Sequence, residues 1–201
     1  MNKNLLKTTF TALFAAIICI GCFMKIPVGV VPIVLQNMLC ILSAVVLGGI
    51  YGAAPTLLFV IAGAIGLPVF SGGSGGLATL FGPTGGFIIG YLLGAVAAGL
   101  IAGKPSVSEK KLSKRTVIRV CAAFVAGAVI IYIPGIIRFA MWAAGAGKVP
   151  QDKTAFAYTM GAAVLPFLPG DVIKMLIMIP LSLKLRPVVA QYISSQDKNA
   201  D

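Results

Sequence analysis

The stretch Pro169-Gly-Asp-Val-Ile-Lys174 begins an apolar run that continues through Leu183, and it places two charges inside that run. Asp171 and Lys174 are three residues apart, so a helix puts them on one face. A charge at the centre of a bilayer costs roughly 2.5–3.5 kcal/mol on insertion scales, so the pair is expected to face protein, water or a ligand. A ligand site and an internal ion pair that fixes helix packing both satisfy this pattern.

The composition of the chain is that of an integral membrane protein. Of 201 residues, 59% are hydrophobic and 10% are charged, and the mean hydropathy is +1.02. The 24 glycines and 12 prolines fit a bundle of bilayer helices, which use small residues for close approach. Histidine is absent, and the C-x-x-C pair Cys19 and Cys22 lies within an apolar run. We therefore expect no metal site and no cofactor.

Six apolar segments are long enough to cross a bilayer at 1.5 Å per residue. We expect transmembrane helices near 8–24, 33–49, 53–69, 86–103, 116–143 and 168–185. The chain 1–201 then forms a single membrane domain, an all-α six-helix bundle with both termini on one side.

The distribution of the basic residues predicts the orientation of this bundle. The side of the termini carries Lys3, Lys7, Lys104, Lys110, Lys111, Lys114, Arg115, Arg119, Lys184, Arg186 and Lys198, and the opposite side carries Lys25, Lys148 and Lys153. An excess of Lys and Arg marks the cytoplasmic side. The net charge of +11 therefore indicates a multi-pass protein of the cell membrane with cytoplasmic termini, and no nucleic-acid partner.

The first two spans carry small and polar residues whose roles the sequence leaves open. Ala12 and Ala16 form a small-xxx-small face on which another helix can lie closely, within the bundle or in a partner. Gln36 and Asn37 enter the membrane early in the second span, where an amide bonds to a neighbouring helix or to a ligand. The two prolines of 25–32 predict an extended outer segment before them.

A glycine-rich outer loop separates the third and fourth spans. It reads Ser71-Gly-Gly-Ser-Gly-Gly76 and, after Leu77-Ala-Thr-Leu-Phe81, Gly82-Pro-Thr-Gly-Gly86. The Walker spacing is absent, so this is not a nucleotide-binding loop. Glycines permit close backbone approach to a buried partner, and Leu77 and Phe81 provide apolar anchors. We therefore expect an ordered lid rather than a flexible linker.

The fourth span is predicted to pack tightly against another helix. Gly86, Gly90 and Gly94 form a stripe that brings another helix to near backbone contact. The fifth span is long, and Arg138 near its outer end is expected to reach the interface by snorkelling. The segment 154–167 is too short for a separate span, so we expect a helix that lies at the outer surface or dips into the membrane.

Four motifs follow one another in the chain: Val31-Pro-Ile-Val-Leu-Gln36, Gly66-Leu-Pro-Val-Phe-Ser-Gly-Gly-Ser-Gly-Gly76, Gly82-Pro-Thr-Gly-Gly86 and Pro169-Gly-Asp-Val-Ile-Lys174. In this order the chain resembles the biotin-transporter substrate-binding family, BioY, over nearly its whole length. The resemblance implies the S-component of an ATP-dependent energy-coupling factor transporter, a six-helix subunit that captures biotin outside the cell. It implies as partners a transmembrane coupling subunit and two ATP-binding-cassette ATPases, and it makes Ala12 and Ala16 the docking face.

The resemblance also implies a biotin site. Asp171 and Lys174 match the polar pair of the family's site, and the other expected contacts are Ser74 at the variable position between the glycine pairs, Gly72, Gly73, Gly75, Gln36 and the apolar wall Phe81. A carboxylate accepts from the ureido N–H groups of biotin. An ammonium donates to the ureido carbonyl or to the valerate carboxylate, and the sequence leaves open which end Lys174 holds.

Two other classes of function are consistent with such a pocket. No nucleotide motif lies in the chain, so we expect partner ATPases to supply the energy for uptake. A stand-alone facilitator, or an S-component for another small vitamin, would have the same bundle and the same kind of pocket. An intramembrane enzyme using Asp171 as acid or base would need a second carboxylate, a histidine or a metal cluster. None lies within the predicted spans, so we expect no enzyme.

Overall fold

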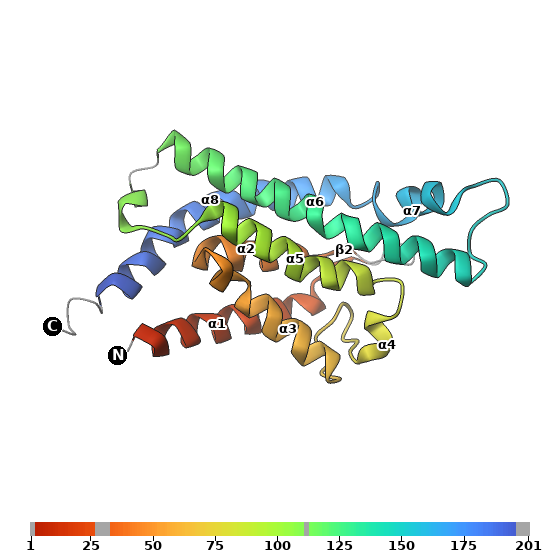
Figure 1. The fold of residues 1–201 in the computed structure, drawn as a ribbon, viewed down its shortest axis with the longest axis horizontal. Helices are drawn as coiled ribbons and strands as arrows, with labels where there is room; N and C mark the ends of the chain where they lie inside the picture. The colour runs from red at the N-terminus through yellow and green to blue at the C-terminus, as the bar shows by residue number, and fades with distance from the viewer. Residues whose placement is uncertain (1–2, 27–32, 111–112, 196–201) are drawn as a thin grey trace.

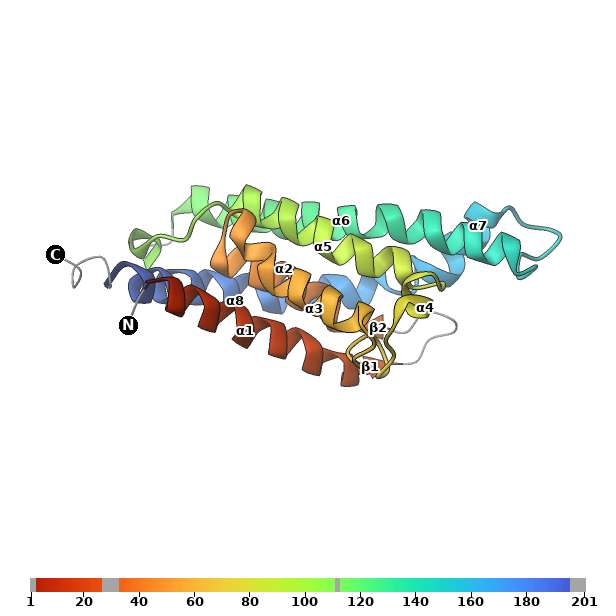
Figure 2. The same ribbon diagram turned by 60° about the horizontal axis from the view of Figure 1, so that its bottom comes forward.

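The computed structural model describes residues 3–26, 33–110 and 113–195, which form an elongated bundle of helices (Figures 1 and 2). The prolines of the predicted extended segment, at 27 and 32, lie outside the described residues. The elements are α1 (Lys3–Ile20), η1 (Gly21–Phe23), β1 (Lys25–Ile26), β2 (Ile33–Val34), α2 (Gln36–Leu47), η2 (Ile50–Ala53), α3 (Ala54–Ala64), α4 (Leu77–Leu80), α5 (Gly85–Ala102), η3 (Val107–Lys110), α6 (Lys114–Gly145), α7 (Ala155–Ala163) and α8 (Leu168–Ser195). The short strands β1 and β2 pair antiparallel.

The helices have different lengths relative to a membrane. The segment Leu5–Phe23, α5 and α6 are each long and apolar enough to cross one. Together α7 and α8 satisfy the same test as a span bent by 47° at the break between them, whereas α2 and the segment Ile50–Ala64 are apolar but shorter. All twelve residues of α2 are buried, so this helix is surrounded by protein and does not need the length of a lipid-facing helix.

Each of the six predicted spans contains one helix, but some of these helices end at other residues than predicted. The third helix, α3, ends at Ala64 rather than near 69, because Gly66 adopts a left-handed φ of +108° and Pro68 follows. The last helix continues to Ser195 rather than ending near 185. The start of α1 and the end of α8 lie at the same end of the bundle, here called the terminal end (Figure 1).

Arg186 lies within α8, past its predicted end. The sequence placed it in the tail among the basic residues on the side of the termini, but the residue has 0% exposure. Its Nε and Nη2 donate to the two carboxylate oxygens of Glu109 at 2.8 and 3.0 Å, and Nη2 also donates to the Ala102 carbonyl at 3.0 Å. Its Nη1 donates to the Val45 carbonyl. One side chain thus joins α8 to the last turns of α2 and α5 and to η3.

The glycine stripe of α5 brings it against α6. The sequence predicted close approach to another helix, and the structure identifies that helix. A Cβ built on Gly86 would lie 2.1 Å from the Pro134 carbonyl oxygen, one on Gly90 2.5 Å from that of Ile131, and one on Gly94 2.6 Å from that of Gly127. No side chain larger than hydrogen fits at these distances, so the stripe fixes the spacing of the two helices.

The segment 154–167 forms α7 at the end of the bundle opposite the terminal end (Figure 1). Its Tyr158 ring stacks on Phe139 of α6 with centroids 6.1 Å apart. Thr159 and Ala163 are buried. The helix therefore packs on the end of α6 opposite the terminal end and precedes α8, whose first turn carries Asp171.

Candidate ligand-binding site

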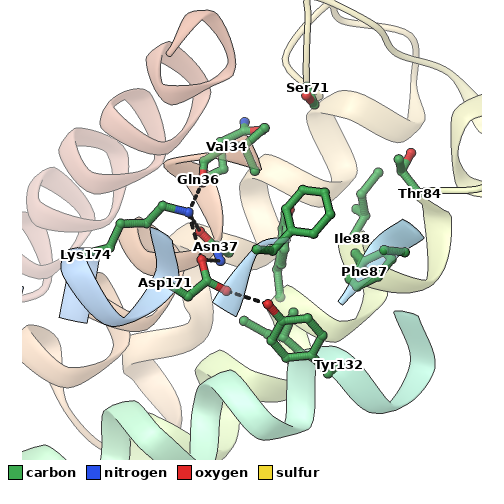
Figure 3. A pocket seen from close by; sticks show the side chains of 14 residues that line it. Val34, Gln36, Asn37, Ser71, Thr84, Phe87, Ile88, Tyr132, Asp171 and Lys174 are labelled. Carbon is green, nitrogen blue, oxygen red and sulfur yellow. Dashed lines mark hydrogen bonds and ion pairs between the residues drawn. The ribbon is translucent and has the colours of Figure 1, made fainter. Parts of the chain in front are cut away.

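A cavity lies between α2, α5, α6 and α8, at the end of the bundle opposite the terminal end (Figure 3). It has about 580 Å³ of empty space, part of which is open to solvent. Apolar side chains form most of its wall, namely Phe87, Ile88, Ile131 and Phe167. Its charged and amide side chains are gathered on the side formed by α2 and α8.

The ion pair predicted from the sequence lies in this cavity. Lys174 Nζ and Asp171 Oδ1 are 2.8 Å apart, and the two side chains are 13% and 6% exposed. Asp171 occupies the first turn of α8, where the partial positive charge of the helix N-terminus favours a carboxylate. The pair therefore faces the protein interior and the cavity, as the cost of placing charges in lipid requires.

Two further side chains complete this polar cluster. Asn37 Nδ2 donates to Asp171 Oδ1 at 2.9 Å, and Tyr132 Oη donates to Asp171 Oδ2 at 2.7 Å. Lys174 also donates to the Val34 carbonyl at 2.6 Å and to Asn37 Oδ1 at 3.3 Å. Residues from α2, α6 and α8 thus converge on one carboxylate (Figure 3).

Sequence reasoning had noted Asn37 only as a weak amide signal and had missed Tyr132. A tyrosine in the middle of an apolar span is compatible with ordinary packing, so its sequence position carries no separate signal. Its role depends on the rotation of α6 relative to α8, which only the fold defines.

Gln36 lines the cavity and also connects three parts of the chain. Its side chain is 1% exposed, and Nε2 donates to the Ile18 carbonyl at 3.1 Å and to the Val69 carbonyl at 2.8 Å. The amide therefore joins the end of α1 and the glycine loop to the start of α2. The position of Gln36 is consistent with both interpretations of the sequence, a hydrogen bond to a neighbouring helix and contact with a ligand.

The glycine loop presents a different serine to the cavity than the sequence suggested. Ser74 does not line it, because Ser74 Oγ donates to the Ser71 carbonyl at 3.1 Å within a tight turn. Gly72 and Gly73 adopt left-handed φ values of +77° and +74° in that turn, and they do not line the cavity either. Ser71 does line it, and its buried Oγ has no hydrogen-bond partner.

The two remaining loop residues of the expected site also lie away from the cavity. Gly75 packs against the chain, since a Cβ there would lie 2.3 Å from the Leu67 carbonyl oxygen. Phe81 was expected as an apolar wall, but its side chain is 69% exposed and follows the single turn of α4. Phe87 lines the cavity where Phe81 was expected to do so.

The small-residue face of α1 points out of the bundle. Ala12 and Ala16 are exposed, whereas Phe14, Ala15 and Ile18 on the other side of the helix are buried. The sequence left open whether this face packs within the bundle or against a partner. The exposure of both alanines shows that it does not pack within the described part of this chain.

Other kinds of site are not evident in the part of the chain that the structure describes. No group of three or more His, Cys, Asp and Glu side chains there could hold a metal ion. An apolar bundle with a buried polar cluster at the head of a cavity defines a class, a membrane protein that binds a small molecule with a polar head and an apolar body.

Comparison with known proteins gives the particular family. The family model described as the BioY family matches residues 1–191, and the chain belongs to that family. It is 38% identical over 183 residues to the biotin transporter BioY of Rhodobacter capsulatus, covering 88% of this chain and 90% of that protein. It is 36% identical over 174 residues to the biotin transporter BioY of Thermotoga maritima, covering 87% and 92%.

The fold matches a crystal structure of the S-component for biotin from an ECF-type ABC transporter. The TM-score is 0.71 at 29% sequence identity, and the match covers 92% of this chain and 94% of that one. The resemblance and the all-helical membrane fold inferred from the sequence are thereby confirmed.

Proposed function

We propose that this chain is the biotin-capturing S-component of an energy-coupling factor transporter. The observation that carries the proposal is the buried cluster of Asp171, Lys174, Asn37 and Tyr132 at the head of an apolar cavity, in a chain that belongs to the BioY family. The neighbour in fold is described as such a component for biotin.

The cluster has unused hydrogen-bonding capacity that fits a ureido ring. An ionised carboxylate offers about four acceptor sites, and Asp171 uses two on Oδ1 and one on Oδ2. A ureido N–H can therefore donate to Oδ2 without displacing a protein group. The second N–H of the Asn37 amide and the unpartnered Ser71 hydroxyl can donate to the ureido carbonyl.

The apolar part of the ligand would lie against α5 and α6. Phe87 and Ile88 from α5 and Ile131 from α6 line that side of the cavity, which suits a thiophane ring and an alkyl chain. Burial of such groups stabilises by about 25 cal/mol per Å² of apolar surface.

The partners and the orientation form part of the proposal. We place the terminal end of the bundle in the cytoplasm, because the basic residues gather there. The exposed Ala12 and Ala16 would receive a transmembrane coupling subunit. Two ATP-binding-cassette ATPases would supply the energy for uptake through the cell membrane. The chain itself would carry out no enzymatic reaction.

Calorimetric titration of the detergent-purified protein with biotin tests the site. We expect tight binding by the parent and at least tenfold weaker binding by Asp171→Asn and by Lys174→Ala, about 1.4 kcal/mol each. Lys148→Ala, which removes an exposed charge, is the matched control and should bind as the parent does. Equal binding by all four proteins would show that the ion pair is only structural.

Uptake by reconstituted vesicles separates the coupled carrier from a stand-alone facilitator. Vesicles containing this chain without the coupling subunit and ATPases should accumulate no biotin. Equilibration of biotin across such vesicles would favour the facilitator. A panel of other small vitamins in the same titration tests the choice of biotin.

A further inference from the structure

The segment 65–81, which joins α3 to the start of the α5 region and includes α4, carries large apolar side chains that point away from the protein. Ile65, Leu67, Leu77 and Phe81 are 76%, 50%, 59% and 69% exposed. The sequence suggested Leu77 and Phe81 as anchors of an ordered lid, but their exposure means that they do not anchor it to the described part of this chain. A cluster of exposed hydrophobic side chains marks a contact with something other than water.

The segment also lacks the charges of a solvated loop. No charged residue lies between Lys25 and Lys104 in the sequence. The connection between α6 and α7, at the same end of the bundle, instead carries the exposed residues Lys148, Asp152 and Lys153 (Figure 2). Charged side chains are costly in the hydrocarbon of a bilayer and apolar ones are not, so the composition of 65–81 suits contact with lipid.

The helix before this segment is too short to cross a membrane alone. The stretch Ile50–Ala64 is apolar, but it is only about 22 Å long at 1.5 Å per residue, against about 30 Å for the hydrocarbon core. Leu57, Leu58 and Ile61 are exposed on α3, and the exposed Ile65 extends their face by one turn. The lipid-facing surface of α3 therefore continues into the segment 65–81.

The backbone of the segment meets the condition that lipid contact imposes. Non-helical backbone is tolerated at membrane depth only where its polar groups bond within the protein. The N–H of Gly72 donates to the Cys22 carbonyl at 3.2 Å, and that of Gly76 to the Gly63 carbonyl at 2.7 Å. Other N–H groups of the segment also donate to carbonyls of this chain, namely those of Gly66, Leu67, Val69, Phe70, Gly73, Thr79 and Phe81. The loop thus directs polar backbone inward and apolar side chains outward.

Arg138 of α6 indicates the depth of the segment. Its Nη2 donates to the Phe81 carbonyl at the end of α4, and the residue is partly buried. An arginine near the end of a membrane helix directs its guanidinium toward the headgroup level. Phe81 is therefore expected near the boundary between hydrocarbon and headgroups, where apolar side chains can enter the acyl layer.

We infer that the segment 65–81 inserts into the membrane leaflet at the end opposite the terminal end, with Ile65, Leu67, Leu77 and Phe81 among the acyl chains. The partner of this surface is lipid, and the segment is not a solvated lid. Ser71 of the same segment lines the cavity (Figure 3), so insertion would hold that wall of the cavity against the bilayer. The inference does not depend on which ligand the cavity binds.

Fluorescence quenching of a single tryptophan tests the insertion. Trp142→Phe removes the only tryptophan of the sequence, and Phe81→Trp or Leu77→Trp then places a reporter in the segment. In phosphatidylcholine vesicles with brominated acyl chains, we expect each reporter to lose about half or more of its fluorescence. Iodide on both sides of the vesicle membrane should leave both reporters nearly unchanged.

Two further positions in the same Trp142→Phe protein calibrate the measurement. Ile133→Trp lies on the exposed face of α6, a helix long and apolar enough to cross a membrane, so brominated chains should quench it and iodide should not. Lys148→Trp lies in the exposed connection after α6, and we expect the opposite result for it.

Two outcomes would overturn the inference. If iodide quenches the reporters at 77 and 81 as it quenches the one at 148, the segment is a solvated lid. If neither quencher reaches them, protein covers the segment, and in these vesicles that protein is a second copy of this chain. Variants are compared only when they melt as cooperatively as the Trp142→Phe protein, and the two reporter positions guard against a variant that does not fold. A failure to bind biotin would refute the proposed function and leave the lipid contact standing.

Discussion

Replacing Glu109 by Gln should destabilise the protein strongly without affecting the ligand. Glu109 is 7% exposed and Arg186 0% exposed, and the pair is bonded at 2.8 Å. Removing one partner of a buried ion pair costs about 3–5 kcal/mol, because the other charge stays buried. Gln keeps an acceptor, so we expect about 3 kcal/mol, or roughly 6–12 °C in melting temperature for a chain of this length.

Arg119 provides a matched comparison on the same carboxylate. Its Nη2 lies 3.1 Å from Glu109 Oε1, but its side chain is 39% exposed. An exposed pair contributes about 0–1 kcal/mol, so Arg119→Gln should lower the melting temperature by only about 2–4 °C or less. Both variants remove a charge from the same cluster, so the difference between their melting temperatures measures the effect of burial.

The assay is thermal melting of the detergent-purified protein, together with biotin titration. Arg186→Met and the double variant Glu109→Gln/Arg186→Met complete a cycle, and we expect the double variant to be at least about 2 kcal/mol more stable than the sum of the single losses predicts. Biotin affinity should stay within about twofold, because Arg186 lies about 22 Å from Asp171 along α8. Equal effects of Glu109→Gln and Arg119→Gln, or strict additivity in the cycle, would refute this reasoning.

Other variants test the cavity and the helix contacts. Tyr132→Phe removes one bond to the charged Asp171, so melting experiments should show a loss of stability of about 1.5–3 kcal/mol, and an unchanged melting temperature would refute the contact. Gln36→Leu leaves the carbonyls that it bonds unpaired and should lower stability by about 2 kcal/mol in melting experiments. Gly90→Val cannot fit against α6 and should abolish the monodisperse peak in size-exclusion chromatography. Ala16→Leu should retain biotin binding and lose uptake in cells that contain the coupling subunits.

The sequence was sufficient for the features that depend on local spacing. Asp171 and Lys174 share a face because they are three residues apart on a helix, and an apolar chain has few other places for two charges. The glycine stripe of α5 likewise predicted close approach to another helix, because Gly86 and Gly90 follow helical periodicity, and the structure shows that this helix is α6. These inferences needed only helix geometry and the cost of charges in lipid.

Features that depend on the relative placement of helices could not be predicted in this way. Arg186 was taken for a surface charge because its partner, Glu109, lies in a loop far away in the sequence, and the receiving carbonyls belong to α2 and α5. The family resemblance pointed to Ser74, whereas Ser71 lines the cavity, in a loop where Gly72 and Gly73 have left-handed φ values. Periodicity carries no information about such turns.

Lys174 and Arg186, two cations of α8 about 18 Å apart along the helix, both bond to the segment that carries α2. Lys174 donates to Val34 just before α2 begins, and Arg186 donates to Val45 near its end. The buried helix α2 is thus held by α8 at both ends.

This arrangement positions Asn37 before any ligand arrives. Asn37 lies on α2 between the two contacts with α8, and its amide already bonds to Asp171. The free energy needed to order the polar head of the site is therefore part of folding and not of binding, which favours affinity. Loss of the Arg186 hydrogen bonds should first lower the stability of the protein. Ligand affinity should fall only when α2 itself shifts, because Lys174 still bonds to Val34 and Asn37 at the cavity end.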